Sequence, residues 1–241
     1  MKSKFSEIGA VEYFSKTSSS YEESVHHRSL GLKYLSYIET NFVEKTIQGI
    51  SNEAYRCLEI GAGTGRFTKL LLKHKCRVDI IEAAPGMVRI LNGKFKKNDI
   101  NVKNIDAGKD FPYSSDYFDY VLAMRVLKYI PEWKRTIKEA YRVLRKRGYF
   151  IFSISNMYSV AYFKGQAHYF LFRPKEVIKY LENLGFDVIK ISATTRLPFI
   201  VYSKINSMYL LNPIIFLENI LTKILPYWLF SRAILIYATK K

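Results

Sequence analysis

Three glycines at alternate positions follow a short apolar run of the chain. The segment that contains them reads Leu58-Glu59-Ile60-Gly61-Ala62-Gly63-Thr64-Gly65-Arg66. Glycine allows a positive φ and lets a ligand approach the backbone closely. Where such a loop opens a helix, its N–H groups also attract a carboxylate or a phosphate. The segment therefore predicts a site for a nucleotide-type cofactor.

The residues around this loop narrow the type of cofactor. Arg66 stands where a dinucleotide-binding loop needs glycine or alanine, and the Gly-Lys-Ser/Thr of a phosphate-binding P-loop does not occur. The carboxylate of Glu59 suits a cofactor that carries an ammonium and a sulfonium, whereas it would repel a pyrophosphate. Glu82, about twenty residues beyond the glycines, can accept hydrogen bonds from a ribose diol. Together these residues favour a cationic nucleoside.

Strands and helices that could position these residues alternate along the chain. Apolar runs closed by turn residues predict strands at 56–60, 77–82, 101–106, 117–124, 149–155, 186–192 and 233–239. Helical spacing of apolar residues predicts helices at 64–75, 85–95, 131–147 and 174–184, and helical structure across 5–50. Strands that alternate with helices indicate βαβ units and a mostly parallel sheet.

Four motifs follow one another between residues 10 and 192. The first is the glycine run, and the second is Ile81-Glu82-Ala83-Ala84-Pro85-Gly86-Met87. The third comprises Asp106-Ala107, Phe111-Pro112 and Tyr117-Phe118-Asp119-Tyr120-Val121, and the fourth is Ala140-Tyr141-Arg142-Val143-Leu144-Arg145-Lys146-Arg147-Gly148. In this order and spacing they resemble the class I S-adenosylmethionine methyltransferases, nearest to the branch of the ubiquinone and menaquinone C-methyltransferases.

The resemblance implies a fold, a cofactor and a set of binding residues. The fold would be α/β, with a Rossmann-like, seven-stranded, mostly parallel sheet flanked by helices and an antiparallel last strand. S-adenosylmethionine would be the cofactor. The implied binding residues are Glu59, Gly61, Ala62, Gly63 and Gly65 at its methionine part, Glu82 at the ribose, Ala83, Met87, Asp106 and Ala107 at the adenine, and Tyr21 as a cover. Plain packing would also explain Tyr21 and Met87.

No catalytic residue follows from the resemblance. Lys128 stands where many relatives carry a histidine, so a general base does not carry over. Methyl transfer from a sulfonium mainly requires that donor and acceptor are aligned and water is excluded. A base is needed only if the acceptor must lose a proton. The candidate on the acceptor side is His168, followed by Tyr13, His26 and His27, although surface or packing roles would also explain them.

The class of acceptor is narrowed by motifs that the chain lacks. No Asp/Asn-Pro-Pro-aromatic run follows the fourth predicted strand, and no Pro-Cys nucleophile occurs. Methylation of exocyclic amino groups on bases and of cytosine C5 is therefore disfavoured. The acceptor expected instead is a small or lipid-like molecule, methylated at O, C or N. The main rival is an RNA acceptor that docks on the basic segment 131–147, and another is a non-catalytic cofactor-binding partner protein.

Composition limits the binding partners and the cellular compartment that we expect for this protein. The formal net charge of +17 attracts anions such as nucleic acid or anionic lipid headgroups. Two cysteines, Cys57 and Cys76, predict neither a disulfide framework nor a four-ligand zinc site, and no metal is expected. Without a secretory signal or a spanning segment in the sequence, we expect a cytoplasmic protein that is at most peripheral to a membrane.

The segment 193–232 interrupts the alternation of strands and helices. Asn212 is predicted to cap a helix, with Pro213 at its first position. One face would carry Ile214, Phe216, Leu217, Ile220, Leu221, Ile224 and Leu225, and the other Glu218, Asn219, Thr222 and Lys223. The apolar face predicts either packing over the core or contact with an anionic membrane. The expected division is a helical cap at 1–50, a cofactor-binding core at 51–192, this helical insert, and a last core strand at 233–241.

Overall fold

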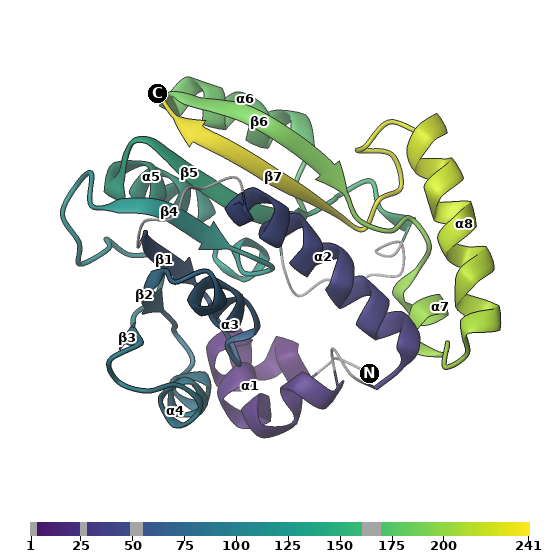
Figure 1. Cartoon of the computed structure of the whole chain (residues 1–241), viewed down its shortest axis with the longest axis horizontal. Helices are drawn as coiled ribbons and strands as arrows, with labels where there is room; N and C mark the ends of the chain where they lie inside the picture. Colours follow the sequence, from purple (N-terminus) through teal and green to yellow (C-terminus); the bar gives the residue numbers. More distant parts are fainter. Residues whose placement is uncertain (1–3, 25–27, 49–54, 161–169) are drawn as a thin grey trace.

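Seven strands form one sheet, and helices cover both of its faces in the computed structural model (Figure 1). The structure describes residues 4–24, 28–48, 55–160 and 170–241. The strands are β1 (Arg56–Ile60), β2 (Arg77–Ile81), β3 (Ile100–Lys103), β4 (Phe118–Ala123), β5 (Leu144–Ser155), β6 (Phe186–Ala193) and β7 (Ala233–Lys240). Their order is β3-β2-β1-β4-β5-β7-β6, and β7 runs antiparallel to both neighbours. The predicted α/β fold with an antiparallel last strand is confirmed.

The helices agree with the predicted alternation, with one shortened element. They are α1 (Lys4–Glu22), α2 (Leu30–Gln48), α3 (Arg66–Lys73), α4 (Pro85–Lys94), α5 (Trp133–Val143), α6 (Pro174–Leu184), α7 (Phe199–Ser203) and α8 (Met208–Ile224), with a 3-10 turn η2 (Leu127–Tyr129). The predicted helix at 131–147 is too long, because residues 144–147 belong to β5. Leu144 is fully buried and pairs with Phe118 of β4, so packing overrides the helix propensity of the basic residues that follow it.

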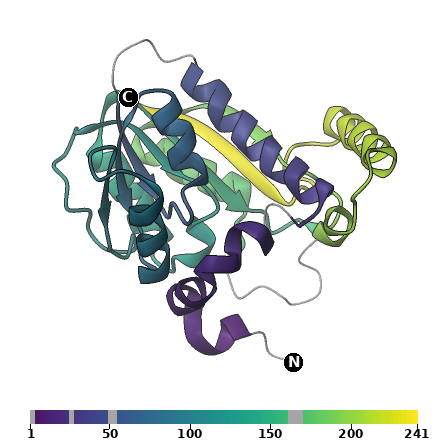
Figure 2. The ribbon, with the colours of Figure 1, turned by 60° about the horizontal axis from the view of Figure 1, so that its bottom comes forward.

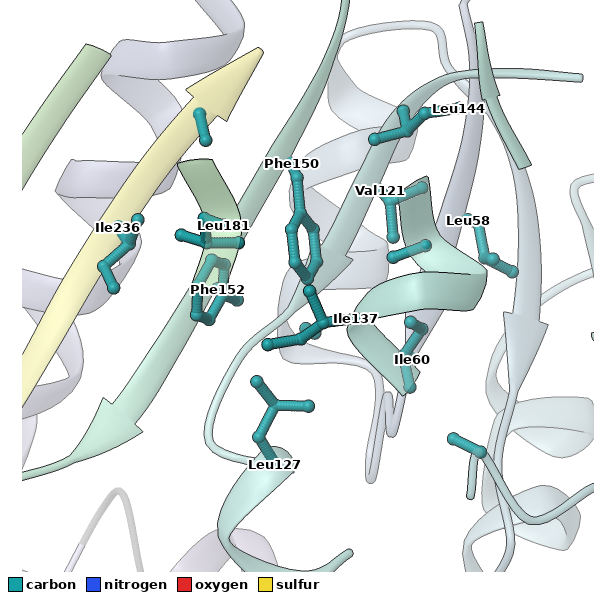
Figure 3. Packing of buried hydrophobic residues seen from close by; sticks show 14 of the residues in the cluster. Leu58, Ile60, Val121, Leu127, Ile137, Leu144, Phe150, Phe152, Leu181 and Ile236 are labelled. Carbon is teal, nitrogen blue, oxygen red and sulfur yellow. The ribbon is translucent and has the colours of Figure 1, made fainter. Parts of the chain in front are cut away.

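One half of the core lies between the sheet and the pair α5 and α6 (Figure 3). Leu58, Val121 and Phe150 come from three neighbouring strands and are fully buried. They belong to the same apolar cluster as Ile137 of α5 and Leu181 of α6. Strands covered on both faces need apolar residues at successive positions, which explains the continuous apolar runs of the sequence.

The opposite face of the sheet is covered by α2 and α3. Val43 of α2 and Leu71 of α3 share an apolar cluster with Leu122 of β4. The hydroxyl of Thr46 in α2 and the phenol of Tyr120 in β4 form a buried hydrogen bond of 2.8 Å. This bond satisfies two polar groups that would otherwise be buried at a cost. It also sets the position of α2 along the sheet.

The order of the strands creates a crevice at the carboxyl ends of β1 and β4. From β1 the chain continues through α3 to β2 on one side, and from β4 it continues through α5 to β5 on the other. Such a point in an open α/β sheet is where ligands bind. The glycine run follows β1 directly, and residues 124–130 follow β4, so both lie at this edge.

Residues 194–232 contain α7 and α8, and α8 lies at the outer edge of the molecule in both views (Figures 1 and 2). The prediction that Asn212 caps this helix is wrong. The cap is Ser207, whose side chain accepts a hydrogen bond from the N–H of Tyr209 at 3.2 Å. Pro213 consequently lies inside α8, where burial of Leu211 keeps the first turns in place. The division into cap, core, insert and last strand stays a prediction.

The orientation of α8 also differs from a core-packed amphipathic helix. Glu218, expected on the outer face, is only 4% exposed. Its carboxylate accepts the N–H of Arg196 at 2.9 and 3.0 Å and the hydroxyl of Tyr202 at 2.5 Å. Phe216 and Ile224 are 68% and 71% exposed. The inward carboxylate therefore turns apolar residues outward. Among the helices that the structure describes, none is long and apolar enough to cross a bilayer.

Candidate functional site

A cavity of about 290 Å³ opens at the carboxyl edge of the sheet, beneath α1. Its lining includes Gly61, Ala62, Gly63 and Thr64 after β1, Glu82, Ala83, Ala84 and Met87 after β2, Ile105, Asp106 and Ala107 after β3, Met124, Arg125, Val126, Tyr129 and Ile130 after β4, and Ala10, Val11, Phe14 and Tyr21 from α1. The cavity therefore collects, in one place, four loops that are distant in the sequence.

The glycine run forms the floor of this cavity. Gly61 and Gly63 have φ angles of +67° and +59°, which side-chain-bearing residues rarely adopt. The N–H of Gly61 donates to the carbonyl of Ile81 at 2.8 Å and ties the loop to the end of β2. A Cβ atom at Gly61 would lie 2.4 Å from Cγ2 of Val126. Glycine is therefore required where the loop after β1 passes the loop after β4.

Glu82 joins the glycine loop to the loop after β2. Its carboxylate accepts the N–H of Gly63 and the N–H of Ala84, both at 2.9 Å. Burial raises the pKa of this carboxyl, and the backbone donors oppose the rise. A carboxylate has about four lone-pair sites, so two bonds leave acceptor capacity toward the cavity. Two adjacent ligand hydroxyls would match that capacity.

The loop after β3 and the start of α4 form a mainly apolar wall of the cavity. Met87 and Ala107 are buried there, next to Ala83. Asp106 adds a carboxylate to this wall, and its Oδ1 accepts the N–H of Gly108 at 2.8 Å. An apolar wall with an acceptor at its edge is suited to a planar ring that carries an amino group.

The N-terminal helix α1 covers the cavity. The rings of Phe14 and Tyr21 meet edge to face with centroids 5.7 Å apart, and Phe14 meets Tyr129 in the same way at 4.9 Å. The N–H of Gly86 donates to the hydroxyl of Ser15 at 2.9 Å. A Cβ at Gly86 would lie 2.2 Å from the carbonyl oxygen of Ser15. α1 is therefore seated closely on α4 and closes the cavity with aromatic rings.

Known proteins share both the central sequence and the fold. Residues 58–152 match the family described as a methyltransferase domain. The uncharacterized protein MJ1123 of Methanocaldococcus jannaschii is 37% identical over 149 residues, which are 58% of this chain and 68% of that protein. The magnesium protoporphyrin IX methyltransferase of Synechocystis PCC 6803, solved with bound S-adenosylmethionine, superposes with a TM-score of 0.63 at 12% identity over 96% of this chain and 99% of that one. The chain belongs to the S-adenosylmethionine-dependent methyltransferases.

This methyltransferase is also similar to a plant hydroquinone methyltransferase. It is 28% identical over 140 residues to the chloroplastic 2-methyl-6-phytyl-1,4-hydroquinone methyltransferase 1 of Oryza sativa. The aligned part is 56% of this chain and spans 42% of the rice enzyme, which is less than half of its length. The expected methyltransferase family and its cofactor, S-adenosylmethionine, are confirmed by the domain match together with the shared fold.

Two residues expected at the cofactor lie behind the cavity of the methyltransferase. Glu59 is 2% exposed, and its carboxylate accepts the hydroxyl of Thr68 in α3 at 2.6 Å. Gly65 lies against α4, where a Cβ would come 2.4 Å from the ring of Phe95. Neither residue lines the cavity, and both support the glycine run from the side away from it. The expected residues that line the cavity itself are Tyr21, Gly61, Ala62, Gly63, Glu82, Ala83, Met87, Asp106 and Ala107.

The buried Glu59 predicts a pH dependence of stability. Burial raises the pKa of its carboxyl from 4.5 to about 7, although the hydroxyl of Thr68 partly opposes this. Between these values the folded protein retains a proton that the unfolded chain releases. The contribution of Glu59 to the free energy of unfolding therefore falls as pH rises from 4.5 to about 7. The fall is up to about 1.4 kcal/mol per pH unit, and it is complete above pH 7.

Removal of this charge is expected to stabilise the protein at high pH. The Glu59→Gln variant keeps an acceptor for Thr68 and should be more stable than the wild type by about 2–3 kcal/mol at pH 8, with little difference at pH 5. Urea unfolding of the cofactor-free protein at both pH values measures this. Glu44→Gln, at the ion pair with Lys73 on the surface, serves as the control. An equal difference at both pH values would contradict the raised pKa.

The structure describes one of the four residues that we expected on the acceptor side. Three of them lie outside the described residues, namely His26, His27 and His168. Tyr13 lies on α1 with its ring 5.4 Å from that of Phe14. The sequence reasoning missed Arg125 and Tyr129, which line the cavity. Their signal was their position directly after a buried strand, at the edge where ligands bind. Within the described ranges, no cluster of histidine, cysteine or acidic residues could hold a metal ion.

Three of the seven basic side chains in segment 131–147 form ion pairs within the protein. Arg142 pairs with Glu139 at 2.7 Å, and Arg135 pairs with Asp110 at 2.8 Å. Arg145, which belongs to β5, pairs with the buried Asp119 of β4 at 2.5 Å. Guanidinium groups held in this way have less charge to offer to a phosphate backbone. The structure thus adds no support for docking of RNA on this segment.

Proposed function

We propose that this methyltransferase transfers a methyl group from S-adenosylmethionine to an apolar, lipid-like acceptor. The observation that carries the proposal is the mixed lining of the cavity. It combines the carboxylates of Glu82 and Asp106 with the aromatic rings of Phe14 and Tyr129. Mainly apolar cavities with a few convergent polar groups are typical ligand sites. The rice relative, named for a phytylated hydroquinone, supports an acceptor of this kind.

The cavity has room and chemistry for this cofactor. No described atom lies within 4 Å of a Cβ built on Gly63, so the glycine loop faces open space. In our proposal the expected residues that line the cavity keep their roles. We assign Glu82 to the ribose hydroxyls. Asp106 and Ala107 contact the amino edge of the adenine, and Ala83 and Met87 contact its faces. The methionine part lies on Gly61, Ala62 and Gly63, with Glu59 and Gly65 behind them, and Tyr21 covers the cofactor.

The residues of this site act by binding and positioning. When bound, S-adenosylmethionine supplies a methyl group attached to a positively charged sulfur, which is a good leaving group. The loops after β1 to β4 hold the donor in one orientation, and α1 excludes water with Phe14 and Tyr21. Alignment and exclusion of water account for most of the rate that such a displacement needs. A proton acceptor is required only for an acceptor atom that must lose a proton.

Transfer of a labelled methyl group tests this function. The full chain is incubated with S-adenosylmethionine labelled at the methyl group and with separated lipid, small-molecule and RNA fractions of cells. We expect label in the lipid fraction with the wild type and much less label with Glu82→Gln. Label in RNA would instead favour the RNA rival. Binding of S-adenosylhomocysteine without any transfer would favour the non-catalytic partner protein.

We propose in addition that α8 brings the enzyme to an anionic membrane surface. The side chains that support this are exposed along α8: Tyr209, Leu210, Phe216, Leu217, Ile220 and Ile224. Tyr209 is 92% exposed, which is more than the intermediate burial usual for tyrosine. The net charge of +17 complements anionic headgroups, and Lys204 and Lys223 stand near the apolar residues. An apolar helix face with basic residues beside it is the pattern of an interfacial helix.

Flotation with vesicles measures this membrane contact. The wild type should float with vesicles that contain phosphatidylglycerol and remain unbound with vesicles of phosphatidylcholine alone. The double variant Phe216→Ser, Ile224→Ser should lose more than tenfold in vesicle affinity, since each buried apolar side chain contributes about 1.5–3 kcal/mol. Ile189→Ser, at another exposed apolar residue on β6, should bind like the wild type. Equal flotation of the double variant and the wild type would rule out α8 as the contact.

A further inference from the structure

One side chain ties the loop after β2 to the loop after β3. Asn104 directly follows β3, and its side-chain amide donates to the carbonyl of Glu82 at 2.8 Å and to the carbonyl of Ala83 at 3.0 Å. Both partners are acceptors, so the NH₂ end of the amide faces them. The N–H of Glu82 also donates to the carbonyl of Lys103 at 3.1 Å. Asn104 thus extends the contact between the two strands beyond their last paired residues.

The two carbonyls that Asn104 holds share their peptide groups with N–H donors of the Glu82 carboxylate. A trans peptide group is planar, and its C=O and N–H point in opposite directions. The carbonyl of Ala83 is joined in this way to the N–H of Ala84, which donates to Oε1 of Glu82 at 2.9 Å. The carbonyl of Glu82 is joined to the N–H of Ala83. Because Asn104 fixes the carbonyl ends, it also fixes the direction of the N–H ends.

These N–H groups influence both the charge and the direction of the Glu82 carboxylate. Its second oxygen, Oε2, accepts the N–H of Gly63 at 2.9 Å. Burial raises the pKa of this carboxyl, and the N–H groups of Ala84, Gly63 and Ala83 oppose the rise. A rotated peptide group would weaken the hydrogen bonds that favour the ionised form. It would also allow the carboxylate to turn within the cavity that Glu82 and Ala83 line.

We propose that Asn104 is a positioning residue, which aims the carboxylate of Glu82 at the ribose of the bound cofactor by holding the backbone of Glu82 and Ala83. The inference rests on the proposed function, in which Glu82 accepts the ribose hydroxyls. Asn104 itself is exposed and does not line the cavity, so its effect on the cofactor passes through these two residues. Loss of its side chain should therefore weaken recognition of the ribose and leave the buried core unchanged.

Two ligands that differ in one ribose hydroxyl test this role. S-adenosylhomocysteine and its 2′-deoxy analogue are titrated by calorimetry into the full chain and into the variant Asn104→Ala. The wild type should bind S-adenosylhomocysteine about tenfold or more tightly than the analogue, because hydrogen bonds to a carboxylate are the stronger ones. Asn104→Ala should bind S-adenosylhomocysteine about tenfold more weakly than the wild type does, but the analogue only about threefold more weakly.

Asn101→Ala is the matched control for this variant. Asn101 lies three residues earlier, in β3, and is likewise exposed. Its amide donates to Oδ1 of Asp79 in β2 at 2.6 Å, so it joins the same two strands. Neither Asn101 nor Asp79 lines the cavity, and the control should keep both affinities of the wild type.

The pKa of Glu82 in the cofactor-free protein gives a second measurement. Asn104→Ala should raise the pKa of this carboxyl, because the N–H groups that favour its ionised form lose their fixed direction. Carbon-13 NMR of labelled glutamate carboxyls follows the titration, and Glu82→Gln identifies the signal.

Three results would overturn the role of Asn104: equal binding of both ligands by the wild type, weakening of both ligands by the same factor in Asn104→Ala, or an unchanged pKa of Glu82. Failure of the wild type to bind S-adenosylhomocysteine would instead refute the proposed function, and the NMR titration would still decide whether Asn104 positions Glu82.

Discussion

The Glu82→Gln variant is expected to bind S-adenosylhomocysteine about 100-fold more weakly than the wild type. The carboxylate of Glu82 accepts the N–H groups of Gly63 and Ala84 at 2.9 Å each, and we assign its remaining acceptor capacity to the ribose hydroxyls. Glutamine offers one oxygen, so its NH₂ group would face one of these donors. A hydrogen bond to a charged group contributes about 1.5–3 kcal/mol, and loss of one backbone bond together with a ribose contact yields this factor.

Calorimetry on the two proteins measures this change, and Asp119→Asn provides a matched control. Asp119 and Glu82 are equally buried, each 8% exposed. Asp119 also accepts a backbone N–H, that of Arg56 at 2.8 Å, but it stands at the amino end of β4, away from the cavity. The control should lose stability and keep its affinity for S-adenosylhomocysteine. Equal loss of affinity in both variants would show that general destabilisation, and not contact with the ribose, is responsible.

Replacement of Gly61 by alanine is expected to destabilise the cofactor-free protein by about 3 kcal/mol, and replacement of Gly63 by about 1–2 kcal/mol. Both residues have positive φ angles, so alanine strains the backbone at either position. At Gly61 the added Cβ also meets Cγ2 of Val126 at 2.4 Å, whereas at Gly63 no described atom lies within 4 Å. The difference between the two variants therefore isolates the steric contact from the backbone strain.

Urea unfolding without cofactor measures both losses. Gly93→Ala in α4 is the control, because that position has open space around its Cβ and an ordinary helical backbone. It should gain about 0.5–1 kcal/mol, as expected for alanine in place of glycine inside a helix. Equal destabilisation by Gly61→Ala and Gly63→Ala would mean that the loop after β4 moves away from the glycine run without cost.

Much of the cavity lining could be predicted because its signals are local. The glycine run and Glu82 directly follow buried strands, and Asp106 comes three residues after the end of β3. The carboxyl ends of parallel strands meet at one edge of a sheet, so position along the chain was enough to bring these residues together. Glu59 shows the limit of this reasoning. It lies within the motif, yet its side chain points to Thr68 and lies behind the cavity, because successive side chains of a strand alternate between the two faces.

The surfaces that we propose to face an acceptor or a membrane could not be predicted in the same way. Periodicity divided α8 into an apolar and a polar face, but it could not show that Glu218 is held inside by Arg196 and Tyr202. Likewise, nothing local shows that Glu39 of α2 forms ion pairs with Arg125, which lines the cavity, and with Arg232, because the three come from separate segments.

Patterns within single segments thus specified the sheet, its helices, the family and the cofactor loops. Alternating apolar runs and glycine positions need no distant partner to be recognised. Which face of α8 points outward, and which cations gather around Glu39, depends on hydrogen bonds and ion pairs between segments far apart in the chain. Those contacts exist only after the segments have packed together.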